Sequence, residues 1–463
     1  MFVVDWLIIG VYFLVLTIIV ILVRRARTIS DFAVGSREIP AAIVFATLSA
    51  SLIGPGYSMG IANNAAQHGI IWVLIFGAFS LQMTLIGKFV APRLRKFDKA
   101  FTIGDILGYR YGKLVKFISG IISVVLLAGF VGVIARASGD IIYAITGMNF
   151  LWAIILSTFV VIAYSTFGGI KSVIITDVIQ FIILAVAIPV TIIFMTGGKI
   201  QEAMINVPAE MFSLRGKFPL VVLIGLFASF FFGEMLLPMY ATRALVAKGR
   251  NEAKNGFMLT GIFSLIWFFL CAIIGILGIL TFPESQNPFV SVLKFGLPVG
   301  LTGLAVAALF SIIMSSQSSI LNAAAVTFNF DVLSTFSKKY RSENKALRTS
   351  RWLNVLIGAL AVFFALNVPG VVEALLICYT LWAPTVVLPL IIAVFSWKVK
   401  PIAAFAAIMA GGVATGVWEW GFGNPYEVPS LVIGVIVNQL AFWSFHFWVK
   451  NPDQNSLFQP VKE

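Results

Sequence analysis

Long runs of apolar residues, separated by short polar segments, follow one another along the whole chain. Runs of about 17–25 such residues are long enough to cross a bilayer as helices. The short alternating segments that are typical of a membrane β-barrel are missing from the sequence. The pattern therefore predicts an all-α polytopic membrane protein. Thirteen transmembrane helices are expected, at residues 4–23, 40–62, 69–91, 117–143, 150–167, 173–196, 218–241, 256–281, 299–329, 352–367, 371–396, 401–420 and 429–448.

Composition and charge agree with this interpretation. Of the 463 residues, 60% are hydrophobic and 11% are charged, which excludes an ordinary soluble globular protein. The net charge of +13 could indicate a nucleic-acid partner. With the N-terminus outside, however, 27 of the 32 Lys and Arg residues fall in inner loops such as "TRALVAKGRNEAK" (Thr242–Lys254). Four fall outside: Lys199, Arg215, Lys217 and Lys294. This asymmetry predicts an outer N-terminus, a cytoplasmic C-terminus, the lipid bilayer as a partner and no nucleic acid.

Two of the predicted helices contain residues that break helices. Gly54, Pro55 and Gly56 lie near the middle of the second span, and Gly233 and Pro238 interrupt the seventh. Unwound backbone persists inside a membrane only where it lines a cavity or binds a ligand. Broken helices five spans apart predict a five-plus-five inverted repeat, an arrangement that transporters use.

This repeat predicts the organisation of the chain. Residues 1–38 are expected to form the first helix and a cytoplasmic loop. Residues 39–400 are expected to form the transport core, with repeat one at about 39–200 and repeat two at about 216–400. Residues 401–463 are expected to add two further helices and a short cytoplasmic tail.

Four ionisable residues lie within or close to predicted spans, where charge is costly and often functional. Arg136 and Asp140 are four residues apart on one helix face, so they form either a structural pair or a pair that faces substrate. Asp177 is either a solvated acid at a helix end or a cation ligand. Glu234 lies beside the second helix break, and we expect it to be functional.

A group of serines also stands out in the ninth predicted span. Ser315, Ser316, Ser318 and Ser319 lie within five consecutive residues. Small hydroxyl side chains can simply allow close helix packing. They also supply hard oxygen donors, which suit a small cation, and we favour this second interpretation.

Several segments resemble those of one transporter family. They are "DFAVGSREIP" (Asp31–Pro40), "FTIGDILGYRYG" (Phe101–Gly112), "FGGIKSVIITDVIQ" (Phe167–Gln180) and "PMYATRALVAK" (Pro238–Lys248). In this order they resemble the sodium:solute symporter family, over roughly residues 30–400. That family carries sugars, proline, pantothenate, sialic acid and monocarboxylates. The resemblance implies sodium as the coupling ion and no organic cofactor.

The resemblance also implies two sodium sites. The ligands of the main site would be the carbonyl groups of Ala50, Ile53 and Ile312 and the hydroxyl groups of Ser315 and Ser316. Some members of the family bind a second sodium ion. The matching residues here are Asp177, Ser315, Ser318 and Ser319.

The resemblance says less about the substrate. Tyr57, Phe76 and Phe79 occupy positions where sugar carriers of the family place polar groups, which argues against a hexose. The candidate substrate-binding residues are Tyr57, Arg136, Asp140, Phe230 and Glu234. The acids and the arginine among them suit a zwitterion or a substrate with an amino group.

We therefore expect a sodium-coupled symporter that imports a small organic solute, amino-acid-like or carboxylate, across the cell (inner) membrane. The alternatives are a solute sensor and a proton-coupled carrier built on the same fold. An enzyme is not expected, because His68 and His446 lack metal-ligand spacing and no nucleophile elbow or Walker loop occurs.

Overall fold

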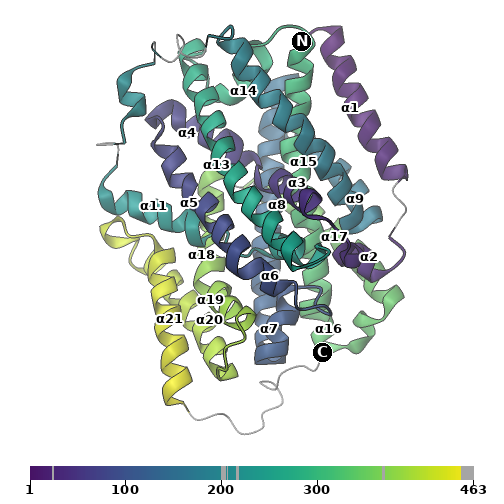
Figure 1. The fold of residues 1–463 in the computed structure, drawn as a ribbon, viewed down its shortest axis with the longest axis vertical. Coiled ribbons are helices and arrows are strands. Elements are labelled where there is room, and N and C mark those ends of the chain that lie inside the picture. The colour runs from purple at the N-terminus through teal and green to yellow at the C-terminus, as the bar shows by residue number, and fades with distance from the viewer. Residues whose placement is uncertain (23–25, 200–204, 206, 215–217, 368–370, 450–463) are drawn as a thin grey trace.

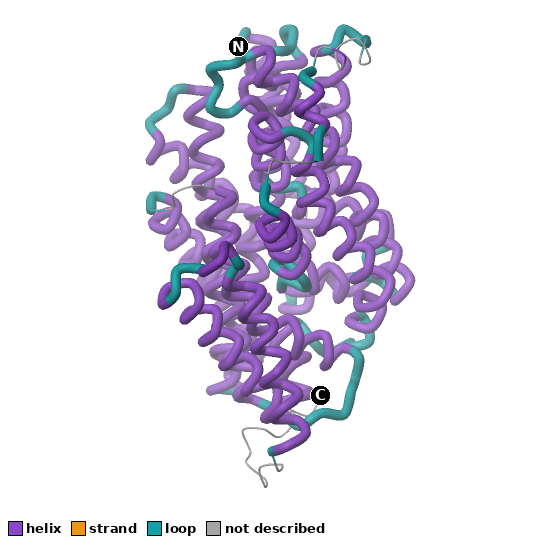
Figure 2. Tube along the Cα trace, turned by 90° about the vertical axis from the view of Figure 1, so that its left-hand side faces the viewer, coloured by secondary structure: helices purple, strands orange, loops and turns teal. Residues whose placement is uncertain are grey.

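The computed structural model is a bundle of helices that run mostly along its long axis (Figures 1 and 2). It describes the whole chain except residues 23–25, 200–204, 206, 215–217, 368–370 and 450–463. The predicted tail from Lys450, and Arg215 and Lys217, therefore lie outside the described residues. Helix α1 begins at one end of the bundle, and the last helix ends at the other (Figure 1).

The helices follow one another along the chain with short connections. The α-helices are α1 (Val3–Leu22), α2 (Ile29–Val34), α3 (Ala41–Leu52), α4 (Ile61–His68), α5 (Ile71–Leu85), α6 (Ala91–Leu94), α7 (Ile103–Tyr111), α8 (Lys113–Thr146), α9 (Phe150–Met195), α11 (Leu220–Phe232), α12 (Pro238–Val246), α13 (Arg250–Thr281), α14 (Pro288–Phe295), α15 (Leu301–Thr327), α16 (Ser334–Phe336), α17 (Glu343–Ala365), α18 (Val371–Trp382), α19 (Leu388–Val394), α20 (Pro401–Gly416) and α21 (Ser430–Trp448). Short π-helical turns extend several of them: η2 (Gly56–Gly60), η3 (Ile86–Val90), η5 (Phe328–Leu333), η7 (Ala383–Val387) and η8 (Val417–Gly421).

The all-helical prediction is confirmed, and the count of thirteen spans stays a prediction. Within the described residues, nine helices are long and apolar enough to cross a membrane, or ten if the bent pair Ala41–Leu52 and Gly56–His68 is one span. Val3–Ile19 and Leu220–Phe232 are shorter apolar helices. The two spans predicted at 150–167 and 173–196 both lie in α9, because the chain stays helical on either side of a kink.

Gly169 forms the kink in α9, and its φ of +60° favours glycine. A Cβ atom on Gly169 would lie 2.7 Å from the Cα of Phe32, so α2 packs closely against the kink. Lys171 Nζ lies 2.6 Å from Asp31 Oδ1 and lowers the pKa of the Asp31 carboxyl to about 2. These contacts fix α2 against α9.

Helix α15 lies at the centre of the bundle, between α3, α8 and α9 (Figure 1). In its most apolar window, 89% of the residues are buried, whereas the corresponding fraction for α21 is 28%. Helices α20 and α21 pack against each other at the edge of the bundle (Figure 1). The serine-rich part of α15 is therefore enclosed by protein rather than by lipid.

A short backbone pairing joins the two interrupted helical segments. The amide of Ile39 donates to the carbonyl of Val246 (3.2 Å), and the amide of Lys248 donates to the carbonyl of Ile39 (2.8 Å). The start of α3 and the end of α12 are thus held side by side.

Candidate functional site

The interruption after α3 leaves backbone carbonyl groups without their helical partners. Helix α3 ends at Leu52, and the segment Gly56–His68 is bent by 69° relative to it. Pro55 has no N–H group, so the carbonyl of Ser51 cannot form its usual helical hydrogen bond. The hydroxyl of Ser316 on α15 donates to this carbonyl instead, at 2.8 Å.

Ser315 forms the second link between α15 and the end of α3. Its hydroxyl oxygen lies 2.8 Å from the carbonyl oxygen of Ala50, 2.7 Å from that of Ser311 in its own helix and 3.4 Å from that of Ile312. Ser316 is equally close to the break, because a Cβ atom on Gly54 would lie 2.7 Å from Ser316 Oγ. Oxygen atoms predicted to bind the main sodium ion therefore meet where α3 faces α15.

The fifth predicted ligand of this group is engaged elsewhere. The carbonyl of Ile53 accepts a hydrogen bond from the hydroxyl of Ser58 at 2.9 Å. Ser58 also accepts a hydrogen bond from Trp267 Nε1 at 3.1 Å. A carbonyl oxygen has two lone pairs, so the Ile53 carbonyl can bind a cation while Ser58 remains in place.

The residues predicted for a second sodium ion surround an arginine. Asp177 Oδ2 accepts hydrogen bonds from the hydroxyls of Thr47 (2.5 Å) and Ser51 (3.2 Å). Arg243 Nη2 lies 3.2 Å from Asp177 Oδ2 and 2.5 Å from Ser319 Oγ. Arg243 and Asp177 are 1% and 0% exposed, so they form a fully buried ion pair.

This position of Arg243 corrects its assignment to an inner loop. Helix α12 begins at Pro238, after the second break, and carries Arg243 back among the buried helices. A basic residue that follows an apolar run usually marks the end of a membrane span. Arg243 instead pairs with Asp177 in the protein interior. The other two predicted residues lie differently: Ser318 donates to the carbonyl of Ser315 at 3.2 Å, and the Ser315 hydroxyl faces Ala50.

Glu234 lies in the interruption between α11 and α12 and is 2% exposed. Its Oε1 accepts a hydrogen bond from the hydroxyl of Tyr379, and its Oε2 accepts one from the hydroxyl of Tyr240, both at 2.6 Å. The Tyr57 hydroxyl lies 3.3 Å from that of Tyr379. Trp382 Nε1 donates to the carbonyl of Met235 at 2.8 Å, so a side chain satisfies part of the unwound backbone.

A group of aromatic rings that pack on one another, here called the aromatic cage, adjoins Glu234 through the hydroxyl of Tyr379. The ring centroids of Phe76 and Phe230 are 4.1 Å apart, and those of Phe230 and Tyr379 are 5.9 Å apart. Tyr57 stacks on Phe268 at 5.5 Å. The members of the cage are Tyr57, Phe76, Phe79, Phe230, Phe268 and Tyr379.

A polar cavity of about 460 Å³, here called the vestibule, adjoins the first break. Its lining residues are Pro55, Met59, Gly60, Asn63, Asn64, Gln67, Trp72, Asp140, Gln286, Asn287, Val372 and Leu376. The ring of Trp72 lies 5.7 Å from that of Phe76, so the vestibule borders the aromatic cage.

The structure divides the five predicted substrate residues into two groups. Tyr57, Phe230 and Glu234 come together in the cage. Asp140 lines the vestibule, and its Oδ1 lies 3.6 Å from Arg136 Nε. The Arg136 guanidinium also lies over the Phe150 ring at 4.6 Å.

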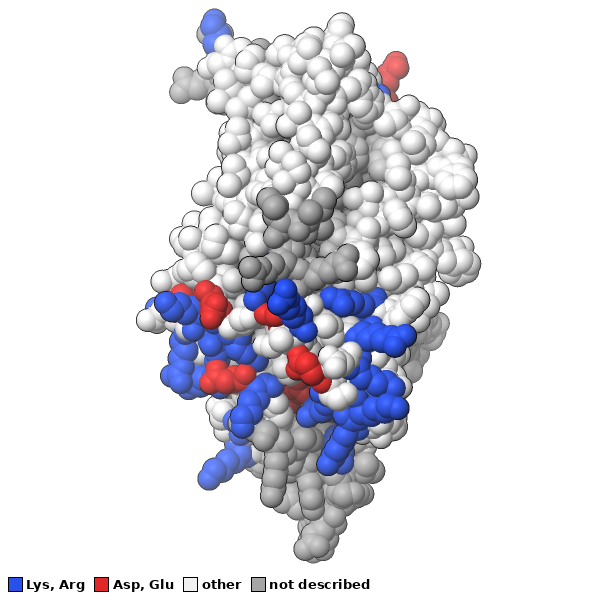
Figure 3. Space-filling view, turned by 90° about the vertical axis from the view of Figure 1, so that its right-hand side faces the viewer, with Lys and Arg blue, Asp and Glu red and all other residues white. Residues whose placement is uncertain are grey.

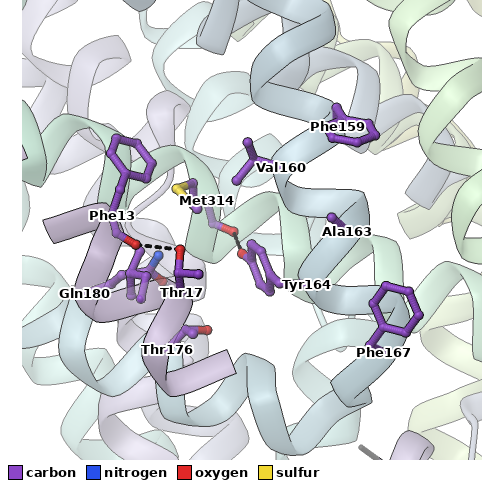
Figure 4. A pocket seen from close by; sticks show the side chains of 11 residues that line it. Phe13, Thr17, Phe159, Val160, Ala163, Tyr164, Phe167, Thr176, Gln180 and Met314 are labelled. Atoms are coloured by element: carbon purple, nitrogen blue, oxygen red, sulfur yellow. Dashed lines mark hydrogen bonds between the residues drawn. The ribbon is translucent and has the colours of Figure 1, made fainter. Parts of the chain in front are cut away.

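A second cavity, of about 300 Å³, lies between α1, both arms of α9 and α15 (Figure 4). Tyr164 donates to the carbonyl of Met314 at 2.9 Å across it, and Thr17 donates to the carbonyl of Phe13. None of its lining residues carries a charge. Met314, which precedes the serine-rich segment of α15, lines this cavity. The lining offers a cation no carboxylate.

A family model and several known transporters match most of this chain. A model of the sodium:solute symporter family matches residues 32–411. The high-affinity proline transporter PutP of Bacillus subtilis is 24% identical over 85% of this chain and 88% of its own length. A sodium/proline symporter of Staphylococcus aureus is 25% identical over 94% of this chain and 92% of its own.

Solved structures share the fold. A Na+-coupled sialic acid symporter, in a substrate-bound outward-open state, has a TM-score of 0.85 and 18% identity, covering 97% of this chain and 99% of that chain. Mhp1, a nucleobase-cation-symport-1 family transporter, in a closed conformation with bromovinylhydantoin bound, has a TM-score of 0.61 and 14% identity. It covers 89% of this chain and 94% of its own.

Proposed function

The chain belongs to the sodium:solute symporter family, and we propose how its residues carry out sodium-coupled import of a small organic solute. The family and the relatives are transporters, so the protein is a multi-pass transporter of the cell membrane with sodium as its coupling ion. We propose that the main sodium ion binds the carbonyls of Ala50, Ile53 and Ile312 and the hydroxyls of Ser315 and Ser316. The observation that carries this proposal is the contact of both hydroxyls with the carbonyls freed by the break.

The same break would couple the ion to the solute. The amide of Tyr57 donates to the carbonyl of Gly54 at 3.1 Å, and the Tyr57 ring belongs to the aromatic cage. A sodium ion that fixes the end of α3 against α15 would therefore also fix one wall of the solute site. Release of the ion would loosen that wall and lower the affinity for the solute.

Substitution of Gly54 by alanine tests this arrangement. The new methyl group would lie 2.7 Å from Ser316 Oγ and 3.3 Å from its Cβ, and overpacking of this kind costs about 1–3 kcal/mol. We expect sodium to raise the unfolding temperature of the purified wild type much more than that of Gly54→Ala. Gly10→Ala is the control, because nothing lies within 4 Å of a Cβ at Gly10. Equal responses to sodium in all three proteins would contradict the proposed site.

We propose that the inverted repeat organises the core as predicted: residues 1–38 precede it, repeat one spans about 39–200, repeat two spans about 216–400, and residues 401–463 follow it. Two interrupted segments, joined by the pairing of Ile39 with Val246 and Lys248, support this division. Alternating access would come from rocking of one helix bundle against the other around these segments.

We also propose that the N-terminus lies outside the cell membrane, which would be the inner membrane of a bacterium, and that the C-terminus is cytoplasmic. On the face shown in Figure 3, Lys and Arg side chains gather in the lower part, and a broad middle region lacks charge. Helix α1 begins at the opposite, upper end (Figure 1). Basic side chains are enriched on the cytoplasmic side of membrane proteins.

We propose that Asp177, Ser315, Ser318 and Ser319 bind a second sodium ion when Arg243 turns away from Asp177. Asp177 Oδ1 and two of the three guanidinium nitrogens of Arg243 have no hydrogen-bond partner here, so the pair keeps unused binding capacity. The prediction is a Hill slope for sodium above 1 in wild-type uptake, falling to about 1 in Asp177→Asn and Ser318→Ala. A wild-type slope of 1 would contradict a second coupled ion.

The solute is proposed to be amino-acid-like. Two of the relatives are named for proline, and Glu234 offers a buried carboxylate to an amino group. The vestibule, with Asp140 in its lining and Arg136 beside Asp140, would form the route from outside to the aromatic cage.

A further inference from the structure

A cavity of about 400 Å³, here called the basic pocket, lies where α7, the turn between α19 and α20, and the last turn of α21 meet. These elements lie in the lower part of the bundle (Figure 1), the end at which basic side chains gather (Figure 3). We infer that the basic pocket binds the phosphate group of an anionic phospholipid. This inference goes beyond solute transport and uses no residue of the proposed sodium and solute sites.

The charged residues that line the basic pocket are all cations. They are Arg110, Lys398 and Lys400, and the lining includes no Asp or Glu. Within the described part of the chain, none of the three forms an ion pair with an acid. Arg110 Nη2 donates to the hydroxyl of Ser396. Lys400 Nζ donates to the carbonyl of Val449 at 2.7 Å. A guanidinium has five N–H donors and an ammonium has three, so both side chains keep donors for an anion.

A histidine and a helix start add further donors. The amide of Lys400 donates to His446 Nδ1 at 3.5 Å. An imidazole that accepts at Nδ1 carries its proton at Nε2, so His446 can donate to an anion from Nε2. Helix α20 starts at Pro401, which lines the pocket, and no side chain caps this end. The positive end of a helix favours an anion, and here it adds to three cationic side chains.

The turn that carries the two lysines is held in place by α7. Ser396 in this turn has a φ of +61°, which is uncommon for a residue other than glycine, and Arg110 bonds its hydroxyl. The hydroxyl of Tyr111, the next residue of α7, donates to the carbonyl of Pro389 in α19 at 3.0 Å. The segment Phe101–Gly112 has no role in the proposed sodium and solute sites, and these contacts give it one. The basic pocket is therefore already formed before a ligand arrives.

An apolar path leads away from the basic pocket along α21. Trp397 lines the pocket and is 53% exposed. Its ring lies 6.2 Å from that of Trp443, which stacks on Phe447 at 5.9 Å. Ile436, Leu440, Trp443 and Phe447 share one face of α21, because they are spaced by four, three and four residues. Ile436, Leu440 and Phe447 are exposed.

This path favours a lipid over a free phosphate ion. From Ile436 to Phe447 the helix rises by about 16 Å, close to the roughly 15 Å of hydrocarbon in one leaflet. An acyl chain would cover this face while the phosphate group lies in the basic pocket. Exposed tryptophan side chains are typical of the level of the lipid headgroups. In the proposed orientation this end of the protein meets the cytoplasmic leaflet, which contains anionic lipids.

A lipid in the basic pocket would join two parts of the protein. Arg110 belongs to the proposed transport core, whereas Pro401 and His446 belong to the two helices that follow the core. A phosphate group that bonds both parts would hold α20 and α21 against α7. A ligand that binds only the folded state raises the unfolding temperature, so this measurement reports binding.

The test uses the purified full-length protein in detergent and three probes at equal concentrations. Dioctanoyl phosphatidylglycerol is an anionic lipid. Dioctanoyl phosphatidylcholine has the same chains and a phosphate group but no net charge, and inorganic phosphate has the charge without the chains. We expect phosphatidylglycerol to raise the unfolding temperature of the wild type and the other two probes to leave it unchanged.

Two double variants, each without two positive charges, assign the effect to the basic pocket. For Lys398→Gln with Lys400→Gln, we expect a tenfold to thirtyfold increase, roughly, in the phosphatidylglycerol concentration for half-maximal stabilisation. The control is Lys338→Gln with Lys339→Gln, which changes two exposed lysines of η6 (Lys338–Arg341) outside the pocket. The control is expected to respond as the wild type does. The unfolding temperature without lipid shows that each variant is folded.

Several outcomes would overturn the inference. One is an equal response to phosphatidylglycerol in both double variants, which would indicate general attraction to positive charge. The others are an equal effect of phosphatidylcholine, an equal effect of inorganic phosphate, and no effect of phosphatidylglycerol on the wild type. The test measures neither sodium binding nor uptake, so failure of this inference leaves the proposed function standing.

Discussion

Substitution of Ser316 by alanine is expected to raise the sodium concentration for half-maximal uptake by about tenfold to a hundredfold. The hydroxyl donates to the carbonyl of Ser51 at 2.8 Å and is one of two side-chain oxygens proposed for the main sodium site. A hydrogen bond or ligand contact to a charged group contributes about 1.5–3 kcal/mol, which corresponds to this range of affinity. The measurement is the sodium dependence of uptake into proteoliposomes.

The matched control is Ser138→Ala. Ser138 is a fully buried serine of α8 whose hydroxyl donates to the carbonyl of Ile134 in its own helix, at 2.8 Å. The variant loses the same oxygen atom from the protein interior, but that oxygen bonds a carbonyl of its own helix and none of the proposed sodium ligands. An equal rise in both variants would show that the effect comes from a general loss of packing and would contradict the role of Ser316.

Replacement of Arg243 by methionine is expected to destabilise the protein more than any other substitution considered. It leaves Asp177 as a buried charge without a cationic partner, and loss of one member of a buried pair costs about 3–5 kcal/mol. We expect a large fall in the unfolding temperature of the purified protein.

The double variant Arg243→Met with Asp177→Leu separates charge from shape. Replacement of a whole buried ion pair by apolar residues is often neutral or stabilising. The double variant is therefore expected to recover most of the lost stability, although it removes the proposed second sodium site. The loss of stability in the double variant could instead equal the sum of the losses in Arg243→Met and in Asp177→Leu. That result would show that the broken ion pair does not cause the destabilisation.

The sequence predicted features that depend on local chemistry. Glycine and proline interrupt helices even within an apolar run. The chain bends by 69° where Gly54, Pro55 and Gly56 occur. The resemblance to the family, rather than the spacing of the serines, put Ser315 and Ser316 opposite this break. Both hydroxyls contact carbonyl groups at the end of α3, and sodium binding there stays a prediction. The family was likewise visible in segments whose order along the chain is fixed.

The sequence did not predict partners that come from distant parts of the chain. Arg243 follows an apolar run, as a basic residue at the end of a span does, and its burial depends on how α12 packs against α15. Tyr240 and Tyr379 have apolar neighbours and gave no sign of a polar partner, yet both donate to Glu234. An unpaired acid such as Asp177 in an apolar run was the one signal that could have led to Arg243.

The central claim is that sodium drives solute import through the site where α3 faces α15. The most direct test is uptake of labelled proline, choline, lactate and glucose into proteoliposomes under an inward sodium gradient, an equal potassium gradient and an inward proton gradient. We predict transient accumulation of a solute above its outside concentration with the sodium gradient alone. Accumulation of the same size with potassium, or with protons and no sodium, would contradict it.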